Sequence, residues 1–236
     1  MNDTLFSPEL PEWGKRIAVF DLETTGLDLR EARIVTACAV ELDEYGQVVG
    51  RDIEWLANPG IDIPEIAASV HGITTEHAKE HGRPSAEVVA EIVATLRRFF
   101  ERGLPVVAYN APYDFTILLH EAIRHGVEPL RDPSPVIDPL VIDKHFDKYR
   151  AGKRRLEITA EFYGVPLTDA HNATADAIAA GRVAQALFAK FPMPEDVQEL
   201  HAAQVNWSKE QDLSFAKFMQ AKDPNFTPQL GWPIKG

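Results

Sequence analysis

Apolar residues recur along the chain with two periods, and together these predict a sheet covered by helices on both faces. Nearly continuous apolar runs, typical of strands buried on both sides, lie at 17–20, 34–42, 104–109 and 136–138. A further strand is expected over 48–56, where mixed polarity suggests an edge position. Apolar residues at helical spacing are found over 85–102, 112–125, 155–163, 173–189 and 195–221. Hairpin-connected strands come first, and strands alternating with helices follow. We therefore expect an α/β fold with a mixed five-stranded sheet and helices on both faces.

The pattern changes twice along the chain, and this predicts three parts. Residues 1–14 are polar and contain prolines, as a terminal tail does. Residues 15–191 carry the strands and helices of one domain, and a length of 236 residues leaves room for an appendage beside it. Pro192 and Pro194 then interrupt the pattern. We expect 192–236 to form a helical and extended appendage whose proline-rich end lies on the surface.

Two acidic residues interrupt the first apolar run where it ends. Asp21 and Glu23 are two positions apart, so in a strand their side chains point to one side while Leu22 points to the other. Two carboxylates at this spacing repel each other and lose hydration when they are buried. Either the strand end faces water, or a hard cation such as Mg²⁺ or Mn²⁺ lies between the carboxylates.

Two more acids each lie in the first turn of a predicted helix, at the head of an apolar stripe. Asp114 is followed at helical spacing by Ile117 and Leu118, and Asp176 is followed by Ala180. The favourable field at a helix N-terminus can explain either acid alone. A buried acid nevertheless needs a partner. Four inward-facing acids, from one strand end and two helix starts, are better explained by a shared metal centre.

A histidine lies beside the last of these acids. His171 is five residues before Asp176, in the loop or first turn of the helix. A lone histidine near a helix start is usually structural, but its place here adds to the case for a metal centre. The four acids together carry four negative charges. That is enough to hold two divalent ions ~3.5–4 Å apart, the usual arrangement for phosphodiester displacement.

Composition narrows the setting in which the protein works. The hydrophobic fraction of 45% is ordinary for a globular protein. No apolar run approaches the ~18 residues that a membrane span needs, and the N-terminus lacks the basic start and apolar core of a secretory signal. Cys38 is the single cysteine and lies within an apolar run. We therefore expect a buried thiol and a cytoplasmic protein with no membrane contact.

The charge is strongly acidic overall and locally basic. A net charge of −12 argues against broad nucleic-acid binding, but it does not exclude an enzyme that takes one strand end into a metal site. Six basic residues gather between 144 and 155, opposed only by Asp147. They form either a solvated loop or a flank that contacts phosphates. The six are Lys144, Lys148, Arg150, Lys153, Arg154 and Arg155.

Three motifs resemble those of the DEDDh 3′–5′ exonucleases. Residues 20–27 resemble the first motif, and Asn110-Ala111-Pro112-Tyr113-Asp114 resembles the second. His171 followed at +5 by Asp176 resembles the third, and the histidine distinguishes this subtype from the one with tyrosine. The similarity is greatest to proteins like the epsilon proofreading subunit of bacterial DNA polymerase III. It covers about residues 15–189, so it implies a ribonuclease H-like exonuclease domain over 15–191.

The resemblance implies hydrolysis of phosphodiester bonds from a 3′ end. Asp21, Glu23, Asp114 and Asp176 would bind two Mg²⁺ or Mn²⁺ ions, and His171 would accept the proton of the attacking water. The turn after the first motif would grip the terminal nucleotide. The residues implied in substrate binding are Thr24, Thr25, Gly26, Leu27, His71 and Asn110. His71 can equally be a residue that shapes its own loop.

Three functions remain open at this point. A DNA exonuclease that releases 5′-nucleoside monophosphates, with a polymerase or repair protein as partner, is favoured. A ribonuclease trimming RNA would use the same motifs, because contacts to the 2′-hydroxyl leave no signature in them. A polymerase-associated binding subunit is supported only by a faint similarity of Gln211–Phe215 to a sliding-clamp peptide. The presence of all four acids argues against that third function.

Overall fold

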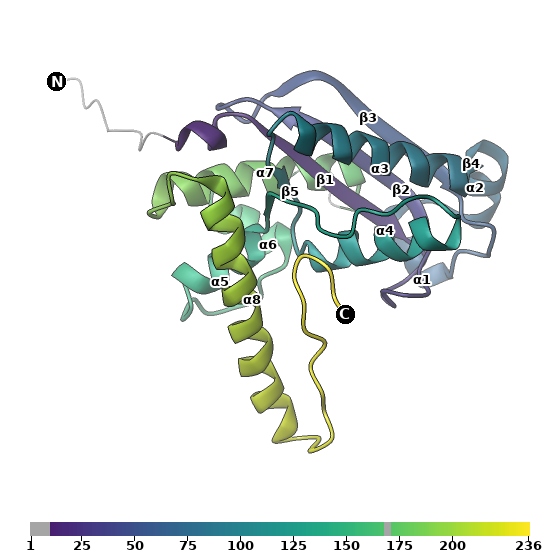
Figure 1. The fold of residues 1–236 in the computed structure, drawn as a ribbon. Helices are drawn as coiled ribbons and strands as arrows, with labels where there is room; N and C mark the ends of the chain where they lie inside the picture. The colour runs from purple at the N-terminus through teal and green to yellow at the C-terminus, as the bar shows by residue number, and fades with distance from the viewer. Residues whose placement is uncertain (1–9, 168–170) are drawn as a thin grey trace.

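The computed structural model describes residues 10–167 and 171–236, and in these ranges a twisted sheet lies between layers of helices (Figure 1). The strand order is β4-β3-β2-β1-β5-β6. Strands β1, β2 and β3 pair antiparallel, whereas β5 and β6 run parallel to β1. The strands are β1 (Ile17–Thr24), β2 (Ile34–Leu42), β3 (Val48–Asn58), β4 (Arg83–Pro84), β5 (Val106–Val107) and β6 (Val136–Ile137).

The predicted α/β mixed sheet is confirmed, but the prediction of five strands is wrong. The sixth strand, β4, has only two residues and pairs in parallel with the end of β3. Both of its residues are exposed, so it leaves no apolar signal. The connection between β3 and β4 also contains two helices that the apolar pattern does not predict, α1 (Glu65–His71) and α2 (Thr75–His81). Among these helical residues only Ala78 is buried, which explains why neither helix shows an apolar stripe.

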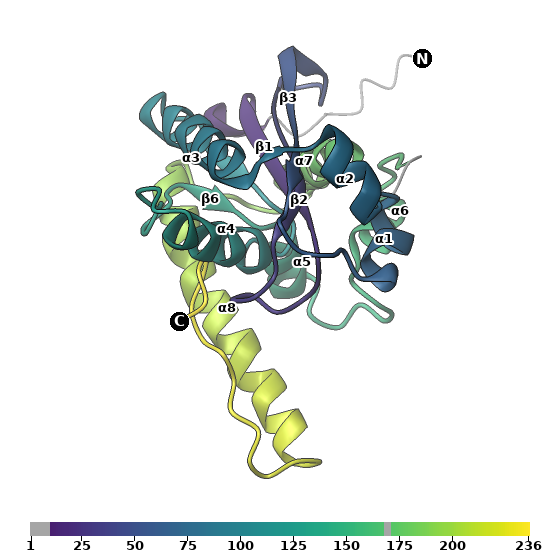
Figure 2. The ribbon, with the colours of Figure 1, turned by 90° about the vertical axis from the view of Figure 1, so that its right-hand side faces the viewer.

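Helices cover the two faces of the sheet in separate groups (Figures 1 and 2). Helices α3 (Ser85–Glu101) and α4 (Pro112–Arg124) pack on one face. Helices α5 (Pro139–Phe146), α6 (Leu156–Phe162) and α7 (Ala173–Lys190) lie on the other. Of these, α5 is an element that the apolar pattern does not predict. A short 3₁₀ helix, Glu12–Gly14, precedes β1.

The alternation of β1 assigns its side chains to the two faces. Phe20 and Leu22 belong to the core beneath α3 and α4, whereas Ile17 and Val19 belong to the core beneath α7. Asp21 continues the row of Ile17 and Val19 because side chains alternate along a strand. The acids therefore end the row of β1 that faces α7.

Helix α7 lies unusually close to the sheet because its inner face is made of small residues. Ala177, Ala180 and Ala184 are at most 2% exposed. A Cβ atom on Gly181 would lie 2.5 Å from Val19 Cγ1 and 2.6 Å from Leu42 Cδ1. That close approach requires glycine and sets the distance of α7 from β1. The first turn of α7 is thereby held beside the sheet.

The C-terminal residues form a helix and an extended return. Helix α8 (Val197–Gln220) confirms the predicted helix over 195–221. Its distal half projects beyond the body of the protein, and the following chain runs back beside it toward α4 (Figures 1 and 2). Lys235 N–H donates to Thr116 Oγ1 at 2.9 Å, so the terminus lies on α4. No helix in the described ranges is both long and apolar enough to cross a bilayer.

The single cysteine is found where the sequence predicts it. Cys38 lies in β2, fully buried, opposite Asp21 in the register. Burial raises the pKa of its thiol to about 12. The thiol is therefore protonated at neutral pH and packs as a small apolar group.

Candidate active site

The acids of β1 lie near the C-terminal end of the strand, where it leads into a polar connection. Asp21 and Glu23 are half-buried, and Leu22 between them is 3% exposed and points to the opposite face. This is the alternation that the sequence predicts. Burial, followed by the charge of Asp176, raises the pKa of Glu23 to about 8. Burial and three neighbouring acids raise the pKa of Asp21 well above its usual range.

Asp114 is held from the first turn of α4 against the backbone of β1. Its side chain is buried, and its Oδ1 accepts a hydrogen bond from Leu22 N–H at 3.0 Å. Burial raises the pKa of Asp114, and the charges of Asp138 and Glu23 raise it further, while backbone hydrogen bonds oppose the shift. A macrodipole contact alone does not account for this acid, because its oxygen bonds another element.

Asp176 and His171 enter from the start of α7. The Asn172 side chain caps this helix by accepting from Thr174 N–H and Ala175 N–H, both at 3.1 Å. Asp176 Oδ2 accepts from the backbone N–H of His171 at 3.0 Å. His171 has a left-handed φ of 70°, which an L-residue adopts rarely and often at functional sites.

These groups converge at one place. One ligand atom from each of Glu23, His171 and Asp176 lies within 4.8 Å of the others. Asp21 is close enough to Asp114, Glu23 and Asp176 for all three charges to raise its pKa. The structure therefore brings the four predicted acids and the predicted histidine together, from one strand end and two helix starts.

This set of donors fits hard divalent cations. Three of the four carboxylates, those of Asp21, Glu23 and Asp114, have pKa values raised by burial and by neighbouring acids, so they are costly to ionise without a compensating positive charge. Carboxylate oxygens are the ligands that Mg²⁺ and Mn²⁺ prefer. The His171 side chain is 46% exposed, with Nε2 3.9 Å from Glu157 Oε1, so its ring can meet both solvent and the acids.

The predicted nucleotide-binding turn is held by its own threonines. Thr24 Oγ1 donates to Gly26 O at 2.8 Å, and Thr25 Oγ1 accepts from Arg33 N–H at 2.9 Å. Both threonine side chains are buried, so they shape the turn. Leu27, by contrast, is 86% exposed and is available for an apolar contact.

His71 and Asn110 are the remaining predicted substrate-binding residues. His71 lines a cavity of about 290 Å³ together with His171 and residues of β2 and β3. Its Nδ1 accepts from Ile73 N–H at 3.2 Å, and burial lowers its pKa, so it also shapes its loop. Asn110 has a left-handed φ of 64° and an exposed side chain just before α4.

Sequence reasoning missed two residues that position the site. The Tyr113 hydroxyl donates to Gly26 O at 2.9 Å and also contacts Thr24 Oγ1, so it braces the turn. Asp138 is fully buried and accepts from the N–H groups of Asn110 at 2.9 Å and Ala111 at 3.0 Å, which fixes the start of α4. The Asp138-Pro139 pair is a helix-start signal that could have identified Asp138.

Of the six basic residues between 144 and 155, two form buried ion pairs and four are exposed. Arg150 and Arg154 turn inward onto the fully buried carboxylate of Asp143. Neither alternative, a solvated loop or a flank that contacts phosphates, describes these two residues. The exposed members are Lys144, Lys148, Lys153 and Arg155. A buried carboxylate needs such partners, and the sequence pattern did not show that Asp143 was buried.

Comparisons with known proteins agree with this arrangement. A family model described as Exonuclease, of the RNase T type, matches residues 18–184. The DNA polymerase III subunit epsilon of Rickettsia felis is 32% identical over 130 residues, which are 54% of this chain and 54% of that protein. The PolC-type DNA polymerase III of Pediococcus pentosaceus is 29% identical over 75% of this chain, but this covers only 12% of that protein.

Solved structures of exonuclease I share the fold. One superposes with a TM-score of 0.64 and 19% identity over 86% of this chain and 46% of that one. The E. coli exonuclease I in complex with a dT13 oligonucleotide gives a TM-score of 0.60 and 21% identity, over 72% of this chain and 40% of that one. The chain thus spans about half or less of each of these proteins. The family match covers most of its length, and the chain belongs to the exonuclease family.

Proposed function

We propose that this protein is a metal-dependent 3′–5′ exonuclease that hydrolyses single-stranded or frayed DNA to 5′-nucleoside monophosphates. The observation that carries the proposal is the convergence of Asp21, Glu23, Asp114, Asp176 and His171 at the end of β1. Family membership supports the reaction class. The oligonucleotide bound by E. coli exonuclease I and the replication roles in the relatives' names favour DNA over RNA.

The proposed roles of the residues come from the family resemblance and are supported by their positions. Asp21, Glu23, Asp114 and Asp176 would hold two Mg²⁺ or Mn²⁺ ions. When bound, such ions activate a water for in-line attack on phosphorus and neutralise charge on the leaving 3′-oxygen. His171 would accept the proton of the attacking water, since its ring is both near the acids and open to solvent.

The turn after β1 would place the 3′-terminal nucleotide. Its backbone is fixed by the Thr24, Thr25 and Tyr113 hydrogen bonds, and the exposed Leu27 is positioned to pack on a base or sugar. His71 and Asn110 would border the same nucleotide. A fixed turn lowers the entropy cost of holding the scissile phosphate in line.

A polymerase or repair complex is the proposed cellular setting, and a cytoplasmic location stays a prediction. The relatives named as polymerase III components support a polymerase partner. The clamp-like segment Gln211–Phe215 does not add support, because it is helical within α8 and Gln211 Nε2 donates to Val141 O at 3.0 Å. We propose an exonuclease domain over 15–191 and a C-terminal appendage over 192–236.

The test is metal-dependent cleavage of matched oligonucleotides labelled at the 5′ or the 3′ end. We expect stepwise shortening of 5′-labelled DNA and immediate release of labelled mononucleotide from 3′-labelled DNA, both stopped by a chelator. Matched RNA measures the preference between the two substrates, and Asp176→Asn is the inactive control. Absence of cleavage of DNA and RNA by protein that binds Mn²⁺ would refute the proposal. Faster cleavage of RNA would select the ribonuclease.

A further inference from the structure

A second concave site lies between α5 and α8, away from the acids. Its volume is about 540 Å³, and its walls come from α5, the loop that follows it and the distal turns of α8. The family match ends at residue 184, so α8 lies beyond it.

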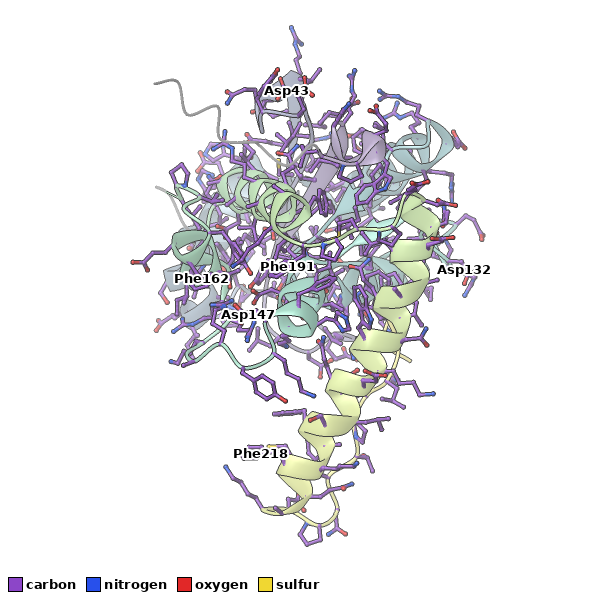
Figure 3. All side chains as sticks on the ribbon, turned by 90° about the vertical axis from the view of Figure 1, so that its left-hand side faces the viewer. Asp43, Asp132, Asp147, Phe162, Phe191 and Phe218 are labelled. Atoms are coloured by element: carbon purple, nitrogen blue, oxygen red, sulfur yellow. The ribbon has the colours of Figure 1, made fainter. Side chains whose placement is uncertain are left out.

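One wall of the cleft is an aromatic face of α8. Trp207, Gln211, Phe215 and Phe218 recur at helical spacing and line the same cleft. Phe215 is 55% exposed and Phe218 is 58% exposed. Figure 3 shows Phe218 on the part of α8 that projects beyond the body. Phe215 packs edge-on against Phe226, and the Lys222 amino group lies over the Phe218 ring, but both phenylalanines keep exposed surface that a ligand can reach.

The facing wall is cationic. Lys144 and Lys148 are exposed at the end of α5 and just after it, and both line the cleft. Arg154 also lines it but is paired with Asp143, and Glu210 is the acid among the lining residues. A local excess of positive charge in a protein of net charge −12 favours a negatively charged ligand.

The two walls are held together at their base, so the cleft is preformed. His145 stacks on Trp207 with ring centroids 3.9 Å apart and an interplanar angle of 12°. Gln211 Nε2 also donates to Val141 O of α5 at 3.0 Å. A groove fixed in this way loses little entropy when a ligand enters it.

We propose that this cleft binds the single-stranded DNA substrate upstream of its 3′ end. Phosphates would contact Lys144 and Lys148, and bases would stack on Phe215 and Phe218. Cationic grooves with aromatic platforms are the usual means of binding single strands without sequence preference. The inference rests on the proposed exonuclease function and adds to it a site for the body of the strand.

The path of positive charge favours nucleic acid over an acidic peptide. Beyond the cleft, exposed Lys153 and Arg155 continue along the loop to the start of α6. Helix α6 carries Glu157, whose Oε1 is 3.9 Å from His171 Nε2. The basic residues thus lead from the cleft toward the proposed catalytic histidine, as a track for a phosphate backbone would.

The test compares short and long substrates in two variants with matched controls. Lys148→Glu and Phe218→Ala alter the cleft, whereas Lys209→Glu and Leu213→Ala make similar changes on α8 at residues that do not line it. For a single-stranded 30-mer we expect KM to rise roughly tenfold in each cleft variant, the effect of losing one stacked base or phosphate contact. We expect kcat, and both constants for a trinucleotide, to stay unchanged, and both control variants to match the wild type.

The outcomes separate this inference from the proposed function. If wild-type protein cleaves neither length, the exonuclease proposal fails. Anisotropy of the labelled 30-mer in chelator then still tests the cleft, since binding weakened only in the cleft variants supports it. Equal effects on both lengths, or none on either, overturn the inference. Loss of binding to an acidic peptide, with DNA constants unchanged, would assign the cleft to a protein partner instead.

Discussion

The starts of α4 and α7 each bring one acid to the site, but they are built differently. Asp114 on α4 is buried and bonded to the backbone of β1, and the turn before it is bonded to Asp138. On α7, Asp176 accepts from a backbone N–H of His171, whose side chain is 46% exposed. One side of the site is a fixed wall, and the other is open to water. This difference suits a reaction that needs both rigid metal ligands and a group that exchanges protons with solvent.

The largest expected effect is loss of activity when either acid is removed, and the two sides of the site should then differ in how much stability is lost. Asp114→Ala and Asp176→Ala should both abolish metal-dependent turnover, because each removes a ligand. Only Asp114→Ala should also lower the free energy of unfolding, by about 1–3 kcal/mol, since the buried Leu22 N–H loses its acceptor. Urea unfolding in chelator measures this, and Asp114→Asn, which keeps an acceptor oxygen, is the control. Normal turnover in Asp176→Ala would contradict the metal-site assignment.

The next effect concerns only the solvent-exposed side of the site, at the start of α7. His171→Ala should lower kcat by roughly 10²–10⁴, the range for loss of a general base, with stability and Mn²⁺ affinity largely kept. Calorimetric titration of Mn²⁺ into wild type and variant checks the second part. If affinity collapses together with kcat, His171 is a metal ligand, which its position within 4.8 Å of Glu23 and Asp176 also permits.

The convergence of the acids could be predicted from the sequence because each one breaks an apolar pattern. Asp21, Glu23, Asp114 and Asp176 interrupt a strand or head a helical stripe, and such an interruption is visible without a structure. The bracing roles of Asp138 and Tyr113 were not found because they depend on contacts between elements far apart in the chain, although the Asp138-Pro139 pair does mark a helix start. Helix α1, with no buried residue, and two-residue β4 likewise lack an apolar signal. An apolar pattern in the sequence reveals which residues are buried. Contacts that brace the site from distant elements can be seen only in the folded structure.

A smaller effect should appear in the pH dependence of stability. The pKa of Glu23 is raised from 4.5 to about 8 in the folded protein without metal. The folded state therefore holds a proton that the unfolded chain releases, and stability should fall as pH rises from about 4.5 to about 8. Mg²⁺ favours the ionised acids, so it should raise Tm more at pH 8 than at pH 5.5. Scanning fluorimetry with Mg²⁺ or chelator tests this, and Glu23→Gln should reduce the difference. An equal Mg²⁺ effect at both pH values would contradict the assignment.

The smallest expected effect tests whether the appendage braces the fixed wall. Trp232 Nε1 donates to Asp138 Oδ2 at 3.3 Å, on the carboxylate that also holds the turn before α4. Trp232→Phe should cost about 1 kcal/mol of stability, the usual value for one hydrogen bond, and lower kcat severalfold through the position of Asp114. Trp13→Phe is the matched control, because it removes an indole bond to Pro194 O at 3.1 Å far from the acids. It should lose similar stability with kcat unchanged. If both variants keep full kcat, the Trp232 bond only anchors the tail, and the rigidity of the α4 wall comes from the catalytic domain itself.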